Sequence, residues 1–378
     1  MTSFGLDLPD YPWDTLTPYI QRAQAHPGGA LNLSIGTPVD PTPEVIRQAL
    51  AGATDAHGYP TTQGQESLRQ AIVDWYDRRR GVPGLSLDQV LPTIGSKELV
   101  AWLPFLLGLG EGDVVVRPTI AYPTYDMGAI LAGATPVAAD SLSELDAETR
   151  SRVRLVWVNS PANPTGIVRD TQELKALVDE ARALGAVVAS DECYAELGWG
   201  DWDTAQGGKP VPSLLDPAVT GGDMSLLLAA YSLSKQSNFA GYRGAFLAGD
   251  RQIMGNLLTS RKHAGMIVPA PVQVAMTAAL KDDSHVEAQK DLYRARRQAL
   301  LPALEAYGLR VDNSEAGLYL WASEGKDCWE TLGKLADLGI IAGPGIFYGE
   351  AGRQHVRMAL TASDADIEAA AQRLAQGQ

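Results

Sequence analysis

The segment YSLSKQSNFAGYRG, residues 231–244, carries the side chains with the clearest chemical potential. Lys235 offers an amine, and Ser232, Ser234 and Arg243 offer hydrogen-bond donors close to it in the chain. An amine can form a Schiff base with an aldehyde, while hydroxyl and guanidinium groups can hold a phosphate dianion. Pyridoxal phosphate is a cofactor that needs both functions. A lysine between serines is equally typical of a solvated loop, so this segment alone does not decide the matter.

A pyridoxal site also needs a carboxylate near the pyridine nitrogen, which keeps the ring protonated as an electron sink. Asp191 follows the apolar, β-branched run 185–190, which predicts a buried strand. Ligands bind at the carboxyl ends of such strands in open α/β sheets. Tyr194 comes three residues later, and its phenol could reach the same ligand. A cap for a loop or a helix is the alternative role for Asp191.

Two further polar groups follow predicted strands. Residues 154–168 predict a strand that runs into a Pro/Asn/Gly turn, where the amide of Asn163 could donate to the phenolic oxygen of the cofactor. Tyr122 follows the apolar run 114–121, and its ring could stack on the pyridine. Ordinary turn chemistry and core packing explain each of these residues equally well when it is taken alone.

A predicted helix start supplies more donors for a phosphate. In PTIGSKELVAWL, residues 92–103, Ser96 and Lys97 precede an apolar-periodic helix. The first backbone N–H groups of a helix have no partner within it, and the helix dipole favours an anion there. A plain serine cap without a ligand is the alternative.

The order of Asn163, Asp191, Lys235 and Arg243 along the chain resembles the class I/II aminotransferases, which are fold-type I pyridoxal enzymes of the aspartate aminotransferase superfamily. The resemblance covers about residues 31–357, and its most specific motifs are NSPANPTG, SDECY, SLSK and GYR. One local departure is visible. Many relatives carry Arg-x-Gly after the lysine, whereas here the glycine follows Arg243 directly.

The resemblance implies a role for each residue of the cofactor site. Lys235 is expected to be the Schiff-base lysine and proton shuttle, and Asp191 to pair with the pyridine nitrogen. Tyr194 and Asn163 are expected to bond the phenolic oxygen, and Tyr122 to stack on the ring. The phosphate is expected to be held by Ser232, Ser234, Arg243 and the backbone amides of Ser96 and Lys97.

The resemblance also implies a substrate site and a dimer. Arg357, in HVRMAL, matches the arginine that binds the α-carboxylate of the substrate, assisted by Asn163 and the backbone around Gly36. Tyr59 matches the tyrosine that reaches the phosphate in the partner subunit's site, so we expect a homodimer. The implied reaction moves an amino group from an amino acid to a 2-oxo acid. In it Lys235 transfers the Cα proton, and acid–base transfer of this kind contributes about 10²–10⁴-fold in rate.

The substrate is predicted from a finer resemblance. Residues 9–46 and 261–273, together with the lysine segment, are similar to the N-succinyldiaminopimelate aminotransferases of lysine and cell-wall biosynthesis. Amino transfer between glutamate and N-succinyl-2-amino-6-oxopimelate is therefore expected. Because that substrate carries several carboxylates, a second cationic position is needed. Lys97, Lys262 and His263 are candidates, although they are equally well explained as surface charges.

Other activities remain open at this point. One alternative is an aminotransferase for LL-diaminopimelate, aspartate or aromatic amino acids, and another is a pyridoxal-dependent C–S β-lyase. A non-catalytic regulator that joins such a domain to a helix-turn-helix is disfavoured, because the N-terminal segment is short, acidic and broken by prolines. Fold resemblance alone does not separate the enzymatic alternatives.

The elements that must position these residues alternate between 44 and 270. A helical pattern at 171–185 connects the predicted strands on either side of it, and further apolar runs follow at 225–232 and 244–250. Such alternation predicts a large α/β domain over residues 44–270, with a mostly parallel sheet flanked by helices. We expect this domain to bind the cofactor.

A different pattern follows residue 270. A long charged helix is predicted at 286–308, short strands at 317–323 and 355–360, and a closing helix at 364–376. Residues 271–378 and 1–43 together are expected to form a smaller α+β domain. The glycine-rich segment 339–349 has no helix-start context and is interpreted as a backbone turn beside the active site.

Composition limits the partners of the chain. The 378 residues carry a formal net charge of −14, which argues against a nucleic-acid partner and requires local arginines to bind an anionic substrate. Cys193 and Cys328 form no disulfide framework, Cys193 is interpreted as buried packing, and five dispersed histidines lack the spacing of metal ligands.

No membrane association is expected either. The opening residues 1–14 are polar and acidic, without the basic and apolar regions of a secretion signal. The longest strongly apolar stretch, 99–110, is too short to span a bilayer and contains Pro104. We therefore expect a cytoplasmic enzyme that acts on small amino acids and 2-oxo acids.

Overall fold

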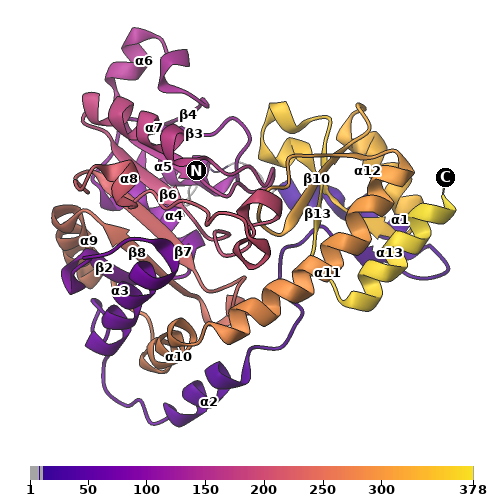
Figure 1. Ribbon diagram of the computed structural model, residues 1–378. Coiled ribbons are helices and arrows are strands. Elements are labelled where there is room, and N and C mark those ends of the chain that lie inside the picture. Colours follow the sequence, from indigo (N-terminus) through magenta and orange to yellow (C-terminus); the bar gives the residue numbers. More distant parts are fainter. Residues whose placement is uncertain (1–7, 9–11, 378) are drawn as a thin grey trace, which may run out of the picture.

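The computed structural model describes residue 8 and residues 12–377 and shows a larger and a smaller lobe (Figure 1). Residues 1–7 and 9–11 lie outside the described residues, and with them the beginning of the predicted small domain and of the segment 9–46.

The larger lobe is built on a seven-stranded sheet with the order β2-β8-β7-β6-β5-β3-β4. Neighbouring strands of this sheet are parallel, except that β8 runs antiparallel to both β2 and β7. The mostly parallel sheet predicted from the alternating pattern is confirmed. The strands are β2 (Val90–Ile94), β3 (Val114–Arg117), β4 (Thr135–Ala138), β5 (Val153–Asn159), β6 (Val187–Asp191), β7 (Leu227–Ser232) and β8 (Gly244–Gly249).

The central strands are apolar because helices cover the sheet on both faces. In β5, Leu155 and Trp157 belong to the hydrophobic cluster on one face, while Val156 and Val158 belong to the cluster on the other. The helices of this lobe are α2 (Glu44–Gly52), α3 (Glu66–Arg80), α4 (Ser96–Leu106), α5 (Thr124–Ala132), α6 (Ala147–Ser151), α7 (Thr171–Ala183), α8 (Pro217–Thr220), α9 (Arg251–Ala264) and α10 (Ala270–Lys281).

Local sequence determines where the connecting helix α7 begins. The Asp170 side chain accepts hydrogen bonds from the backbone N–H groups of Gln172 and Glu173, and the Glu173 side chain accepts one from the backbone N–H of Asp170. This capping box satisfies donors that the first helical turn leaves over. The helix predicted at 171–185 therefore begins where expected, and it ends at Ala183.

The smaller lobe joins the two ends of the described chain. Strand β1 (Leu31–Asn32) pairs in parallel with β11 (Ile340–Ile341). An antiparallel sheet has the order β12 (Gly343–Pro344), β13 (Val356–Ala359), β10 (Tyr319–Ser323) and β9 (Arg310–Asp312). The helices of this lobe are α1 (Thr17–Gln24), α11 (Ser284–Tyr307), α12 (Cys328–Asp337) and α13 (Asp364–Gln376).

The segment 339–349 differs from its interpretation as a simple turn. It contains β11 and β12, followed by the 3₁₀ helix η7 (Gly345–Tyr348). Strands of two residues are too short to show any periodicity in the sequence. The remaining 3₁₀ helices in the described part are η1 (Pro12–Leu16), η2 (Leu87–Gln89), η3 (Leu142–Glu144), η4 (Gly200–Trp202), η5 (Thr204–Gln206), η6 (Ala240–Tyr242) and η8 (Glu350–Gly352).

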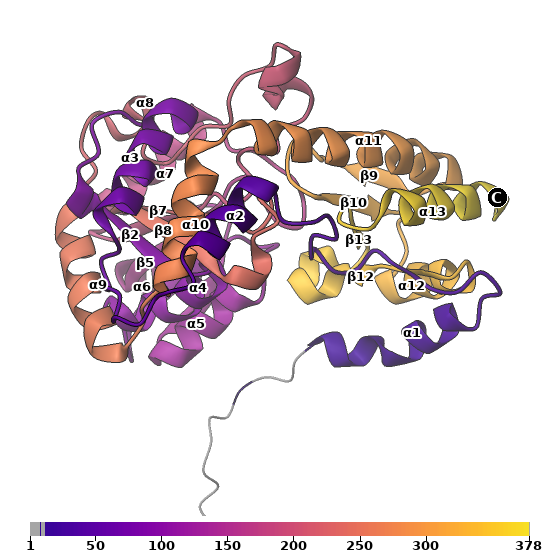
Figure 2. The same cartoon turned by 90° about the horizontal axis from the view of Figure 1, so that it is seen from below.

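The boundary between the lobes lies near α10 and α11. Ala275, Met276 and Ala279 of α10 share a hydrophobic cluster with the seven-stranded sheet, so α10 packs with the larger lobe. Helix α11 then runs from the larger lobe along the smaller one (Figure 2). The division of the chain at residues 43 and 270 stays a prediction.

Within the residues that the structure describes, no helix combines the length and the apolar composition needed to cross a membrane. In the same residues, no group of three or more His, Cys, Asp or Glu side chains is arranged to hold a metal ion.

Candidate active site

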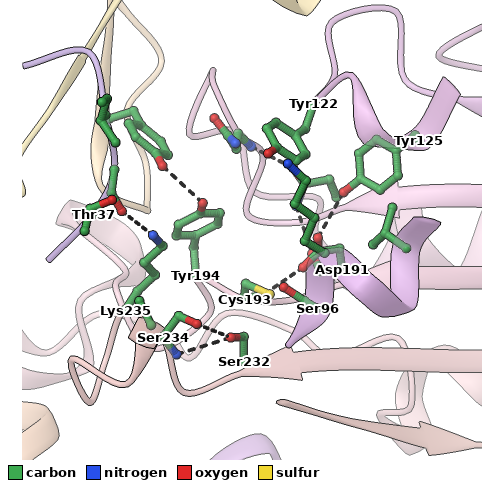
Figure 3. A pocket seen from close by; sticks show the side chains of 18 of the residues that line it. Thr37, Ser96, Tyr122, Tyr125, Asp191, Cys193, Tyr194, Ser232, Ser234 and Lys235 are labelled. Carbon is green, nitrogen blue, oxygen red and sulfur yellow. Dashed lines mark hydrogen bonds between the residues drawn. The ribbon is translucent and has the colours of Figure 1, made fainter. Parts of the chain in front are cut away.

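Most of the predicted site residues surround a cavity of about 350 Å³ at the carboxyl ends of β5, β6 and β7, with walls from both lobes (Figure 3). A cavity of this size is typical of small-molecule sites. The predicted residues that line it are Gly36, Ser96, Lys97, Tyr122, Asn163, Asp191, Tyr194, Ser232, Ser234, Lys235, Arg243 and Arg357.

Three predicted residues are not part of this cavity. Tyr59 is fully exposed on the loop before α3. Lys262 and His263 are exposed near the end of α9, and they do not line the cavity of a single chain. The expected contact of Tyr59 with a partner subunit stays a prediction.

The amine of Lys235 enters the cavity just beyond the end of β7. The strand ends at Ser232, and the turn that follows carries the lysine toward the smaller lobe. Its Nζ donates a hydrogen bond to the carbonyl of Gly36, close to Thr37 (Figure 3). The backbone carbonyl of Lys235 accepts a hydrogen bond of 3.3 Å from the hydroxyl of Tyr293 on α11. The lysine is thus held between the two lobes.

Asp191 lies at the carboxyl end of β6, as the strand pattern predicted. Its Oδ2 accepts a hydrogen bond of 3.1 Å from the Tyr125 hydroxyl, and its Oδ1 accepts one of 3.2 Å from the backbone N–H of Cys193. Burial raises the pKa of Asp191, while the hydrogen bonds from Cys193 and Tyr125 act in the opposite direction. Cys193 is buried as expected, but it also lines the cavity beside this carboxyl group.

The turn that carries Asn163 is tied to the same edge of the sheet by Asn159. The Asn159 Nδ2 donates to the backbone carbonyls of Asp191 (2.9 Å) and Pro161 (3.1 Å). Its Oδ1 accepts a hydrogen bond of 2.7 Å from the backbone N–H of Asn163. Asn159 was missed in the sequence, although it ends β5 directly opposite Asp191 in the register of the sheet.

Donors from three segments meet at the other end of the cavity. The hydroxyls of Ser232 and Ser234 lie 2.9 Å apart, and α4 begins at Ser96 with its first backbone N–H groups unused by the helix. Arg243 reaches this place from a left-handed conformation with φ of +60°. Gly95 also has a positive φ of +81°, and a Cβ on it would run into the Arg243 guanidinium. The Arg243 guanidinium, the two serine hydroxyls and the start of α4 therefore form a cradle of donors suited to an anion, with Arg243 packed against Gly95.

The smaller lobe supplies the carboxylate-binding candidate. Arg357 is 4% exposed, and its Nη1 donates to the Asn163 Oδ1 over 3.0 Å while its Nη2 donates to the Ser34 carbonyl over 2.6 Å. The hydroxyls of Tyr194 and Tyr319 lie 3.4 Å apart. Burial alone would raise the pKa of Tyr319, but the positive charges of Arg357 and Lys235 outweigh it and lower that pKa.

Several lining residues were not foreseen, and most come from segments far apart in the chain. Tyr125 lies three residues after Tyr122, in the first turn of α5, and no sequence pattern connected it to the site. The lining residues missed in the sequence are Trp13, Ile35, Thr37, Val100, Tyr125, Asn159, Ala240 and Tyr319.

The donor set fits pyridoxal phosphate. An amine (Lys235) and a carboxyl group (Asp191) lie in the same cavity as a cradle for a dianion, and Tyr122 also lines this cavity. The chemistry of these groups matches what the cofactor requires of a protein: a nucleophilic amine, a partner for the pyridine nitrogen and donors for the phosphate.

Gly95→Ala is expected to lower the affinity for pyridoxal phosphate about ten- to hundredfold, since the methyl group fills the cradle and displaces the Arg243 guanidinium. Equilibrium titration of the cofactor-free protein measures this effect. Gly81→Ala is the matched control, because Gly81 also has a positive φ (+64°) but nothing lies within 4 Å of an added Cβ. It should lose stability without losing cofactor affinity, and equal losses of affinity in both variants would contradict the cradle.

The comparisons with known proteins agree with this geometry. The family model "Aminotransferase class I and II" matches residues 29–374. The 4-dedimethylamino-4-oxo-anhydrotetracycline transaminase OxyQ of Streptomyces rimosus is 54% identical over 97% of this chain and 99% of its own length. An LL-diaminopimelate aminotransferase of Aquifex aeolicus is 33% identical over 91% of this chain and 90% of its own.

A solved structure supports the same conclusion. The probable N-succinyldiaminopimelate aminotransferase of Thermus thermophilus matches with a TM-score of 0.85 at 27% identity, covering 97% of this chain and 100% of that one. The fold is therefore the fold-type I aminotransferase fold that the motifs indicated. Sequence, architecture and the chemistry of the cavity all agree that the chain belongs to the class I and II aminotransferases, enzymes that use pyridoxal phosphate.

Proposed function

We propose that this aminotransferase moves an amino group between glutamate and N-succinyl-2-amino-6-oxopimelate, in the synthesis of diaminopimelate and lysine. The observation that carries the proposal is a cavity in which the cofactor groups lie beside Arg357 and one further cation, Lys97. Support for the succinylated substrate comes from residues 9–46 and 261–273, and from the Thermus thermophilus relative that is named for it.

Each of the polar residues of the cavity has its own proposed role in the reaction. When bound, pyridoxal phosphate supplies an aldehyde that captures the amino group and a ring that withdraws electrons from Cα. Arg357 and Asn163 orient the α-carboxylate of the substrate. The Lys235 amine takes the proton from the Cα of the substrate and delivers it to the cofactor carbon on the other side of the transferred nitrogen. Asp191 would pair with the pyridine nitrogen of the bound cofactor, and Tyr194 would donate a hydrogen bond to its phenolic oxygen; both residues line the cavity.

Lys97 is the proposed partner for a distal carboxylate. The cations that line the cavity are Lys97, Lys235, Arg243 and Arg357, and the last three already have proposed roles. The Nζ of Lys97 lies 5.8 Å from the centroid of the Tyr122 ring, so it is on the side of the cavity where the cofactor ring is expected to stack.

Lys97→Met is expected to raise KM for N-succinyl-LL-diaminopimelate about tenfold or more, because a hydrogen bond to a charged group is lost. KM for an amino acid with an uncharged side chain should change much less. Steady-state kinetics with both substrates measure the difference. Lys262→Met, an exposed lysine on α9, serves as the control. Equal changes for both substrates would remove Lys97 from the specificity site.

A second candidate has its own support. The relative of Streptomyces rimosus is named for an oxo-anhydrotetracycline, and this chain is 54% identical to it. Trp13, Tyr122 and Tyr319 give the cavity aromatic walls that suit a flat, polycyclic ketone. Amino transfer to such a ketone is therefore the second candidate function, and LL-diaminopimelate, the substrate named for the Aquifex aeolicus relative, is the third.

Half-reactions separate these candidates. The cofactor-loaded enzyme is mixed with N-succinyl-LL-diaminopimelate, LL-diaminopimelate, aspartate or cystathionine, and the loss of the visible absorption band is followed. The enzyme preloaded with an amino group from glutamate is mixed in turn with 4-dedimethylamino-4-oxo-anhydrotetracycline. A fast reaction with the succinylated compound alone supports the proposal. A fast reaction with another compound alone replaces the substrate, and pyruvate and ammonia from cystathionine without an acceptor would indicate a lyase.

We also propose a homodimer in which Tyr59 reaches the phosphate of the partner's cofactor. The fully exposed side chain on a loop outside its own cavity is consistent with such a contact. Sedimentation of the cofactor-loaded enzyme should give twice the mass of the chain, and a fully active monomer would exclude this arrangement.

A further inference from the structure

Two tyrosine rings contact the guanidinium of Arg357. Its Cζ lies 4.0 Å from the centroid of the Tyr319 ring and 5.0 Å from the centroid of the Tyr348 ring. All three residues are buried, with 4%, 5% and 1% of their surfaces exposed. A cation over the face of an aromatic ring is attracted by the ring quadrupole, and the attraction is stronger where water is excluded. The rings therefore compensate part of the cost of burying this charge.

The other partners of Arg357 are neutral. Its guanidinium donates hydrogen bonds to the side-chain oxygen of Asn163 and to the backbone carbonyl of Ser34. Among the ion pairs of residues 12–377, none involves Arg357, although Arg80 and Arg261, which are similarly buried, are each paired with a glutamate. A carboxylate partner within the protein would compete with a substrate carboxylate. Ring faces do not compete, because the N–H donors of a guanidinium lie in its plane.

Tyr348 supports the Arg357 guanidinium from outside the cavity. It ends η7, and its ring makes edge contacts with Trp321 (centroids 5.8 Å apart, 90°) and Trp13 (6.3 Å, 85°). Its backbone carbonyl accepts a hydrogen bond of 2.8 Å from Ala121, the residue before Tyr122. Tyr319 and Arg357 line the cavity, whereas Tyr348 does not. An effect of the Tyr348 ring on a ligand must therefore pass through a residue that lines the cavity, and its ring contacts two of these, Arg357 at 5.0 Å and Trp13 at 6.3 Å.

We propose that Tyr348 is a positioning residue, whose ring holds Arg357 with its in-plane N–H groups directed at the carboxylate of the substrate. The inference deepens the proposed function and rests on the carboxylate-binding role of Arg357. Through the backbone contact with Ala121, the same residue sets the distance between Arg357 in the smaller lobe and the wall of the cavity at Tyr122 in the larger lobe. Carboxylate recognition and cofactor stacking are thus linked at one residue.

Binding of an unreactive dicarboxylate to the cofactor-loaded enzyme tests the proposal. Glutarate, which resembles glutamate without its amino group, is titrated while the visible absorption band of the cofactor is followed. Tyr348→Leu is expected to raise the dissociation constant of glutarate about 5- to 30-fold and to raise KM for glutamate by a similar factor. The affinity for pyridoxal phosphate and the single-turnover rate at saturating glutamate should stay near those of the wild type.

Two further variants separate the ring face from general packing. Tyr348→Phe keeps the ring and should bind glutarate almost as the wild type does. Phe347→Leu changes the neighbouring residue, which packs on Trp13 and Trp329 instead of Arg357, and should also leave glutarate binding unchanged. If glutarate binding is weakened by the same factor in all three variants, packing and not the cation–ring contact is responsible. That result would overturn the proposal.

Arg357→Lys distinguishes the failure of this inference from the failure of the proposed function. If this variant binds glutarate as the wild type does, Arg357 is not the carboxylate site and both ideas fail. If it loses binding while Tyr348→Leu retains it, the role of Arg357 stands and the positioning role of Tyr348 is wrong. Should Tyr348→Leu lose the cofactor band or melt early, Tyr348→Met, which keeps more of the side-chain length, is measured under the same criteria.

Discussion

Lys235→Ala is expected to lower the rate of amino transfer by at least about 10²–10⁴-fold, the contribution of positioned acid–base transfer. The amine reaches the cavity from the end of β7, and its Nζ contacts the Gly36 carbonyl on the opposite wall. The other lysine of the cavity, Lys97, begins α4 on the side of Tyr122. It does not occupy the position from which Lys235 can reach the Cα proton. Single-turnover formation of 2-oxoglutarate from glutamate measures the loss.

Two controls tie this loss to the amine itself. Lys262→Ala, on the exposed face of α9, should leave the rate unchanged. Adding a small primary amine to Lys235→Ala should restore part of the rate, because the amine can enter the volume left by the side chain and carry the proton. A rate within about tenfold of the wild type without added amine would assign proton transfer to another group and would contradict the proposed role of Lys235.

The sequence revealed the polar residues at the carboxyl ends of strands because the pattern there is local. An apolar, β-branched run followed by a polar residue predicted the place of Asp191, and the parallel pairing of β6 with β7 brings it to the same edge of the sheet as Ser232. Asn159 obeys the same rule and was overlooked in favour of the Asn163 turn that it supports. Strand pattern and sheet topology are therefore sufficient to predict the site residues that the larger lobe contributes at the ends of its strands.

The wall from the smaller lobe was less accessible to sequence reasoning. Tyr319 and Tyr348 meet at Arg357, and Trp13 packs on Tyr348, only because η1, β10 and η7 lie together in the fold. Their spacing carries no helical or strand period that connects them to the site. The direction of β8 was likewise hidden, since an antiparallel strand buried on both faces has the same composition as its parallel neighbours.

Asp191→Asn is expected to lower the rate of amino transfer about 10²–10³-fold and yet to stabilise the cofactor-free protein at neutral pH. The rate falls because a preorganised charge beside the pyridine nitrogen is lost, and losses of this kind have that magnitude. The stability rises because burial holds the pKa of Asp191 above its usual value of 3.8. Its carboxylate accepts hydrogen bonds from two neutral groups, the Tyr125 hydroxyl and the backbone N–H of Cys193.

The direction of the stability change in Asp191→Asn follows from proton linkage. A carboxyl group whose pKa is raised by folding binds its proton more tightly in the folded chain than in the unfolded chain. The stability associated with that proton is therefore lost as the pH rises from 3.8 through the raised pKa of Asp191. Above this window the wild type bears a buried charge that the asparagine variant lacks. The two melting temperatures should differ most at neutral pH and converge as the pH falls toward 3.8.

Asp203→Asn provides a control of opposite sign. Asp203 is buried against Lys290 (2.8 Å) and Arg294 (3.0 Å), and although burial alone would raise its pKa, these two cations lower it. Its contribution to stability is present above the pKa of the unfolded chain and is lost as the pH falls through its lowered pKa. The variant should therefore melt below the wild type at neutral pH. Thermal melts of both cofactor-free variants across the pH range test the two signs together.

The outcome shows whether the buried Asp191 carboxyl group stabilises or destabilises the cofactor-free protein. If the cofactor-free Asp191→Asn variant is the more stable one and pyridoxal phosphate stabilises only the wild type strongly, the carboxylate costs folding energy that cofactor binding offsets. The site is then preorganised for a cationic ring at the expense of the empty protein. If the variant instead melts below the wild type at every pH, the hydrogen bonds from Tyr125 and Cys193 outweigh burial, and Asp191 stabilises the fold independently of the cofactor.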